Sequence, residues 1–254
     1  MTSESDEEKG KQLLSAVERL ISSDEKLIEV VEQAQETARE RSPEASKQKE
    51  TLRELTAQQL TRIYSNRAAI AGGAASVPAL IPGFGSIAAA VAGTFAELAY
   101  VLKCEVELCL SISHVYGFDI AEPKERQLAF LMAAVSTYDS DGKNFFADIV
   151  RAEATAIWNY GPRVLSGMVI KAMAVVAVGA IGRGFLKMIP VLGIAIGGGM
   201  NKVLTQRVGN RLSRDFRQRR ELMRAEVTAP EGTRLKKKTK RKSVKKKKKE
   251  EVTE

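Results

Sequence analysis

Two long stretches of apolar and small residues, 68–102 and 164–200, constrain the fold of this chain more than any other feature. Each contains an Ile-Pro step that is followed, after two residues, by a glycine: "IPGFG" at 81–85 and "IPVLG" at 189–193. Proline ends a helix because it lacks a backbone N–H and its ring clashes with the preceding turn. Each stretch therefore predicts a helical hairpin that turns at its Ile-Pro step.

Small residues recur at every fourth position after each predicted turn. Residues four apart lie along one face of a helix, and a row of Gly and Ala lets a neighbouring backbone approach closely. Both rows end in a polar residue, and we interpret Glu97 and Asn201 as a candidate polar site. The rows are Gly85, Ala89, Gly93 and Glu97 in the first stretch, and Gly193, Gly197 and Asn201 in the second.

Neither apolar stretch has the composition of a simple membrane-spanning helix. Such a helix needs roughly 20 apolar residues. Glu97 interrupts the segment 85–102, and Lys171 interrupts the first arm of the second stretch. A charge at the centre of a bilayer costs about 2.5–3.5 kcal/mol on insertion scales. We therefore expect both hairpins to pack in a protein core, and shallow insertion into one leaflet of a membrane is the alternative.

Proline and glycine mark the ends of several further helices. Pro43 predicts a helix that continues through Ile63, because proline is favoured in the first helical turn. Gly117 predicts the end of a helix, and Pro123 predicts the start of the next one. No segment alternates apolar and polar residues as a half-buried strand does. The pattern indicates helices throughout.

The predicted fold is all-α, a helical bundle built around the two Gly/Ala-rich apolar hairpins, with disordered termini. Residues 1–10 are acidic and polar, and we expect them to be disordered. Residues 11–226 are expected to form one all-α domain. Residues 227–254 are expected to form a disordered Lys-rich tail.

The positive charge of the chain is concentrated in that tail. The chain has 40 Lys and Arg, 31 Asp and Glu and a net charge of +9, yet residues 1–231 hold 28 bases and 28 acids. A run of like charges does not fold compactly and binds anionic lipid, nucleic acid or an acidic protein in a salt-dependent way. A basic amphipathic helix, predicted over 201–226, precedes the tail. The predicted anion- or membrane-binding residues are Arg207, Arg211, Arg214, Arg217, Arg234, Lys236, Lys237, Lys238, Lys240, Arg241, Lys242, Lys245, Lys246, Lys247, Lys248 and Lys249.

No catalytic, cofactor-binding or metal-binding residue is predicted. The single histidine, His114, precludes a multi-histidine metal site, and no local pattern pairs it with Cys104 or Cys109. The two cysteines lie five residues apart in one predicted helix, so their side chains point in different directions. The alternative to ordinary helix charges is a buried acidic site made of Glu97, Glu105 and Asp148.

Both halves of the chain resemble the EcsC family. The first half contains "AGGAA", "IPGFG" and "YGFD", and the second contains "IPVLG" followed by an asparagine. The resemblance covers roughly residues 45–220, and it implies a bacterial protein of unknown biochemical activity from a family named for a gene beside an ABC transporter. Glu97 stands where the family pattern has Asp. The matching positions are Gly72, Gly73, Pro82, Gly83, Glu97, Tyr116, Gly117 and Asp119, then Pro190, Gly193, Asn201 and Phe216.

We expect a non-enzymatic helical module that associates with an anionic membrane surface or a membrane protein complex. The opening residues "MTSESDEEKG" carry no secretory signal, so the expected location is cytoplasmic, with a peripheral position at the inner membrane as its more specific form. Two alternatives stay open: a nucleic-acid-associated protein that binds through its tail, and an enzyme with a carboxylate site near Glu97. No cofactor is expected, and the residues identify no small-molecule ligand.

Overall fold

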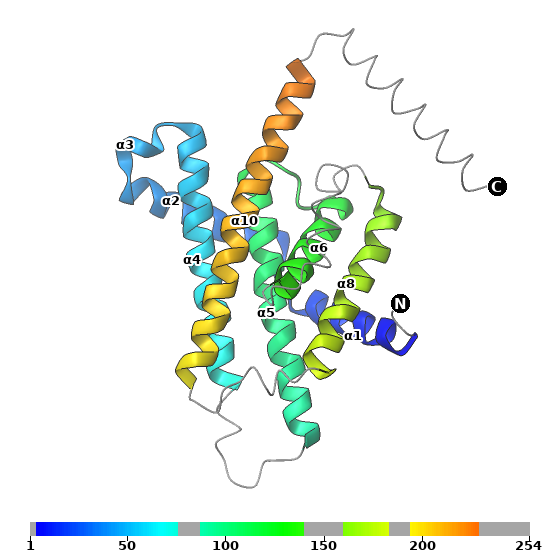
Figure 1. Ribbon diagram of the computed structural model, residues 1–254. Helices are drawn as coiled ribbons and strands as arrows, with labels where there is room; N and C mark the ends of the chain where they lie inside the picture. The colour runs from blue at the N-terminus through cyan, green and yellow to red at the C-terminus, as the bar shows by residue number, and fades with distance from the viewer. Residues whose placement is uncertain (1–3, 76–86, 140–159, 183–193, 229–254) are drawn as a thin grey trace, which may run out of the picture. The chain divides into compact units, whose positions relative to one another are not determined.

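The computed structural model describes residues 4–75, 87–139, 160–182 and 194–228 (Figure 1). These residues form eight helices and no strand, so the all-α prediction is confirmed. The helices are α1 (Glu4–Leu20), α2 (Asp24–Arg41), α3 (Pro43–Ser46), α4 (Lys49–Ala75), α5 (Ile87–Val115), α6 (Pro123–Asp139), α8 (Pro162–Gly182) and α10 (Ile194–Thr228).

Several predicted features lie outside the described residues. Both Ile-Pro turns do, at 81–82 and 189–190, and so does the basic tail from residue 229 onward. The chain divides into two units, Met1–Ser213 and Arg214–Glu254, and the boundary falls within α10.

Helix α5 is the centre of the first unit. It packs against α1, α2, α4, α6 and α8. From Leu98 to Ser113 only Tyr100 and Lys103 are not fully buried. A helix that is buried all round needs apolar or hydrogen-bonded side chains on every face. The neighbouring helices each bury one stripe against the core, such as Leu13 and Val17 of α1.

Glycine and proline end the helices where the sequence predicts. Gly117 has φ 87°, a left-handed conformation that glycine adopts without steric cost. Its N–H donates to the His114 carbonyl at 2.8 Å, and the Phe118 N–H donates to the Ser113 carbonyl at 3.1 Å. This pair of hydrogen bonds is the Schellman arrangement that closes α5. Pro123 then begins α6, as predicted.

Two predictions about helix bounds are wrong. Residues 4–10, expected to be disordered, form the first turns of α1. Acidic residues in the first turn are favourable there because they face the positive end of the helix dipole. The helix predicted from Pro43 through Ile63 is interrupted at Lys47 and Gln48, between the short α3 and the long α4.

One helix among the described residues is long and apolar enough to cross a membrane. The window Pro162–Gly179 of α8 has a mean hydropathy of 1.5, and 39% of it is buried. Helix α8 packs against α1 and α6, and Lys171 is exposed near the middle of the window. The choice between a core helix and membrane insertion therefore stays a prediction.

Helices α1 and α8 approach closely at a glycine. A Cβ atom at Gly10 would lie 2.7 Å from the Ile170 carbonyl oxygen and 2.7 Å from the Ala174 nitrogen. Both atoms belong to the backbone of α8, so a rotamer change cannot relieve the overlap. Glycine at position 10 therefore sets the distance between α1 and α8.

We predict that Gly10→Ala destabilises the protein. The added methyl group forces the two backbones apart, and overpacking of this kind typically costs about 1–3 kcal/mol. Urea unfolding monitored by circular dichroism measures the change in the free energy of unfolding.

Gly167→Ala is the matched control. A Cβ atom at Gly167 meets nothing within 4 Å, and the residue is exposed on α8. Alanine favours a helix interior over glycine by about 1 kcal/mol, so this variant should be slightly more stable than the unaltered chain. Equal stabilities of the two variants would contradict the close approach at Gly10.

Candidate functional site

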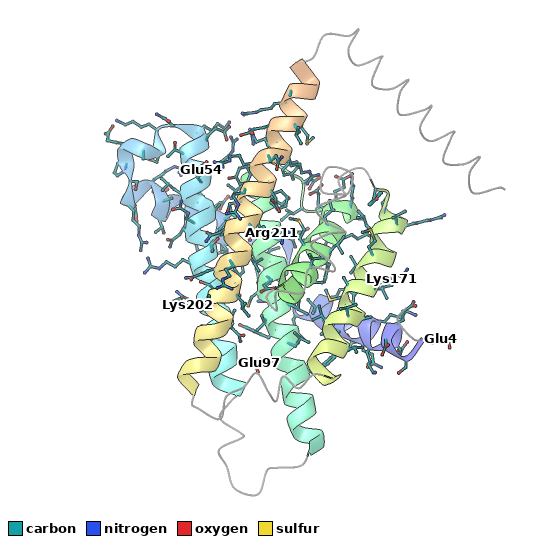
Figure 2. All side chains as sticks on the ribbon, in the orientation of Figure 1. Glu4, Glu54, Glu97, Lys171, Lys202 and Arg211 are labelled. Atoms are coloured by element: carbon teal, nitrogen blue, oxygen red, sulfur yellow. The ribbon has the colours of Figure 1, made fainter. Side chains whose placement is uncertain are left out.

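The structure brings together the two residues of the candidate polar site. Glu97 lies on α5 and Asn201 lies on α10, and Asn201 Nδ2 donates a hydrogen bond to Glu97 Oε1 at 3.2 Å. Asn201 is only 7% exposed, and Glu97 is half-buried. Burial raises the pKa of Glu97, and the hydrogen bond from Asn201 offsets part of that rise. Figure 2 labels Glu97 on the ribbon.

Two members of the wider acidic site, Glu97 and Glu105, lie apart among the described residues. Glu105 is buried on the same helix, but eight residues of helix separate the two positions by about 12 Å along its axis. Asp148 lies outside the described residues. Within the described ranges, no group of three or more His, Cys, Asp or Glu could hold a metal ion. Glu97 and Asn201 thus form a polar pair, with Glu105 two turns away.

A second buried carboxylate, Glu107, binds the junction between α1 and α2. Its side chain is 0% exposed, and its Oε1 accepts a hydrogen bond from the Ser22 N–H at 2.8 Å. Lys103 Nζ lies 2.9 Å from Oε2, one helical turn away on the same helix. The ammonium approaches outside hydrogen-bonding geometry, so this contact is an ion pair. Sequence reasoning missed Glu107, and its only local signal is the Lys103 four residues earlier.

Polar groups of α4 continue this cluster. Tyr64 is fully buried, and its hydroxyl lies 3.2 Å from Ser111 Oγ. Burial is the main cause that raises the pKa of Tyr64 to about 12. The Arg67 guanidinium stacks 4.9 Å from the centre of the Tyr64 ring. The Tyr64–Ser111 contact joins α4 to α5, and the Arg67–Tyr64 contact lies within α4.

Cys104 does not have the surroundings of an activated nucleophile. Cys104 and Cys109 are buried, and neither takes part in a disulfide. Burial raises the pKa of Cys104 to about 12, and the nearby Lys103 only partly counters this effect. A reactive cysteine needs a lowered pKa and solvent access. Cys104 is accordingly part of the core.

A polar groove lies between α4 and the first half of α10. Its volume is about 300 Å³. Thr61 forms the buried floor, and two cations, Arg62 and Lys202, are exposed at the rim. Lys202 is labelled on α10 beside α4 in Figure 2. Sequence reasoning missed this groove. The six lining residues are Gln58, Thr61 and Arg62 of α4, and Lys202, Gln206 and Asn210 of α10.

The predicted anion-binding arginines of α10 differ in exposure. Arg207, Arg214 and Arg217 are exposed, while Arg211 is half-buried. Arg224, which the prediction omitted, is exposed as well. The remaining predicted residues, Arg234 to Lys249, lie outside the described part of the chain.

A family model named EcsC protein family matches residues 7–220, which is most of the chain. The match begins well before residue 45, where the resemblance in the sequence began. Comparison with curated proteins finds no match, and comparison with solved structures finds none either.

We predict that Glu107→Leu strongly destabilises the protein. The variant leaves Lys103, 12% exposed, without its counter-charge and leaves the Ser22 N–H without its acceptor. Removing one partner of a buried ion pair typically costs about 3–5 kcal/mol. Chemical denaturation measures the loss.

The double variant Lys103→Met with Glu107→Leu is the control for this prediction. It removes both charges, so its loss of stability should be smaller than that of Glu107→Leu alone. Lys103→Met alone is measured as well. If the double variant loses at least as much unfolding free energy as Lys103→Met and Glu107→Leu lose in sum, the ion pair does not couple these residues.

We predict that Glu97→Gln becomes more stable relative to the unaltered chain as pH rises. The pKa of Glu97 is raised in the folded state above its ordinary value of 4.5, so ionisation above that value favours unfolding. Gln keeps an oxygen that accepts from Asn201 and has no proton to lose. Denaturant unfolding between pH 4 and pH 8 measures the difference between the two proteins.

Asn201→Ala tests the cause of the same effect. It removes the hydrogen bond that lowers the pKa of Glu97, so the pH dependence attributed to Glu97 should shift to higher pH. A stability difference between Glu97→Gln and the unaltered chain that stays constant over this pH range would refute the assignment.

Proposed function

The chain belongs to the EcsC protein family, and we propose that this member is a helical module that binds the anionic surface of a membrane. It acts by binding rather than by catalysis, from the cytoplasmic face of the membrane. The observation that carries the proposal is the exposed cationic edge of α10.

That edge follows the helical repeat. Arg207, Arg214, Arg217 and Arg224 are separated by seven, three and seven residues, and all four are exposed. Residues at such spacings lie on one side of a helix. One acidic residue, Glu221, is exposed among them. The edge therefore presents an excess of positive charge, which suits a surface of phosphate head groups.

The second unit adds exposed apolar side chains to these cations. Leu222 is 45% exposed and Met223 is 51% exposed, directly before Arg224. Basic helices that lie on membranes place such side chains at the boundary between head groups and acyl chains. Apolar contact there would support binding that charge alone initiates.

The sequence beyond α10 supports the same function. Residues 232–249 carry twelve Lys and Arg and no acid. Each basic residue near an anionic bilayer contributes about 1 kcal/mol, or roughly fivefold in affinity. The attraction acts within a Debye length, about 8 Å at physiological salt. Binding should therefore be strong at low salt and weak at high salt.

We predict that the full chain co-sediments with vesicles containing phosphatidylglycerol and not with vesicles of phosphatidylcholine alone. The fourfold variant Arg207→Gln, Arg214→Gln, Arg217→Gln and Arg224→Gln should bind at least about tenfold more weakly, because the edge loses four charges. The fraction of protein in the pellet, measured across salt concentrations, gives the affinity.

A chain that ends at residue 231 separates the edge from the tail. It should keep part of its vesicle binding, and that part should disappear in the fourfold variant. The nucleic-acid alternative is tested in parallel by retention on double-stranded DNA. If the full chain is retained on DNA and stays in the supernatant with every vesicle, the membrane function is wrong.

A further inference from the structure

We propose that the groove between α4 and α10 binds a phosphate ester that also carries hydroxyl groups. The ligand class is a small polyol or sugar phosphate, either free or as the head group of a phospholipid. Binding of a free phosphate ester is independent of the proposed membrane function, whereas binding of a phospholipid head group rests on it.

Helix periodicity places the lining residues on facing sides of two helices. Gln58, Thr61 and Arg62 lie three and four residues apart on one face of α4. On α10, the lining residues follow at every fourth position from Lys202 to Asn210. Each helix therefore contributes one polar stripe, and the two stripes enclose the groove.

A glycine holds the two helices close beside the groove. A Cβ atom at Gly209 would overlap the side chain of Thr61, which is itself fixed by a 2.8 Å hydrogen bond from its hydroxyl to the Ala57 carbonyl. Because Gly209 allows this approach, the neighbouring side chains of both stripes reach a common space. Its volume, about 300 Å³, is at the small end of the usual range for ligand sites.

The charge of the groove selects an anion. Arg62 and Lys202 line it, and no acidic residue does. In the part of the chain that the structure describes, no salt bridge engages either cation. A guanidinium offers a planar pair of donors that fits phosphate oxygens, and an ammonium offers a compact point charge. Two cations across a small groove suit a phosphate group.

The other lining residues select hydroxyl groups. Gln58, Gln206 and Asn210 are carboxamides, and each offers both a donor and an acceptor. Gln206 is half-buried, whereas Gln58 and Asn210 are exposed. The Thr61 hydroxyl donates a hydrogen bond to the Ala57 carbonyl, and its oxygen can still accept one from a ligand. Hydroxyl groups, which also donate and accept, match this lining better than an apolar group does.

Isothermal titration calorimetry of the full chain tests the proposal with three probes: glycerol 3-phosphate, inorganic phosphate and glycerol. We expect glycerol 3-phosphate to bind more tightly than inorganic phosphate, and glycerol not to bind. Arg62→Gln and Lys202→Gln should each weaken binding of glycerol 3-phosphate by at least about tenfold. Gln206→Leu should remove the preference over inorganic phosphate.

Lys49→Gln is the matched control for these variants. It removes one exposed cation from α4 and leaves the groove lining intact. We expect it to bind glycerol 3-phosphate as the unaltered chain does. Weakening equal to that of Lys202→Gln would mean that general positive charge accounts for the binding, and would overturn the groove as a site. Absence of heat with both phosphate probes would also overturn it.

Vesicle binding distinguishes a free phosphate ester from a lipid head group as the ligand. It also separates the groove proposal from the membrane function. Binding is compared on vesicles with phosphatidylglycerol and on vesicles with the same negative charge supplied by oleate, which has no phosphate. If the groove binds a phospholipid head group, Arg62→Gln weakens binding only to the vesicles that contain phosphatidylglycerol. If glycerol 3-phosphate binds and no vesicle does, the groove stands and the membrane function fails. If the chain binds vesicles, but neither phosphate probe binds and Arg62→Gln changes nothing, the groove proposal is wrong and the membrane function stands.

Discussion

The burial of Glu107 is the constraint on which the packing of the first unit depends. A carboxylate without exposed surface needs a counter-charge and a donor, because desolvation is otherwise too costly. Lys103 supplies the charge from the same helix, and the Ser22 N–H supplies the donor from the α1–α2 junction. That hydrogen bond attaches the junction to α5 and so anchors the C-terminal end of α1. A buried ion pair adds little stability relative to an apolar pair, so we infer that Glu107 mainly selects one arrangement of the helices.

Glycine allows a close approach between helices at two places in this molecule, and the consequences differ. At Gly10 the neighbour is the backbone of α8, and the result is a tight contact in the core. At Gly209 the neighbour is the side chain of Thr61, and polar residues stand on both sides of the contact. Glycine provides the short distance in both cases, and the flanking residues decide whether the contact is sealed or opens into a groove. The first contact therefore contributes to stability, and the second lies beside the groove for which we propose a ligand.

Local chemistry made much of the fold predictable from the sequence. Proline and glycine marked the start of α6 and the end of α5, because their backbone restrictions act without distant partners. The proximity of Glu97 to Asn201 was also foreseen, since each ends a row of small residues. The role of Glu107 was not, because its partner Ser22 lies 85 residues away in the chain. The groove was missed for the same reason: each polar stripe is an ordinary solvated helix face until tertiary packing sets it against the other.

Under the two proposals, the exposed edge of α10 and the groove divide the recognition of anions between them. Exposed arginines attract any polyanion, and they raise its local concentration without distinguishing one head group from another. The groove has only two cations, but it adds three carboxamides whose hydrogen bonds depend on the shape of the ligand. Discrimination comes from such directed bonds, because a site built for a hydroxyl group is left with unpaired polar groups when that hydroxyl is missing. A chain with both features can first be drawn to an anionic surface by charge and then select among the phosphate esters that it meets there.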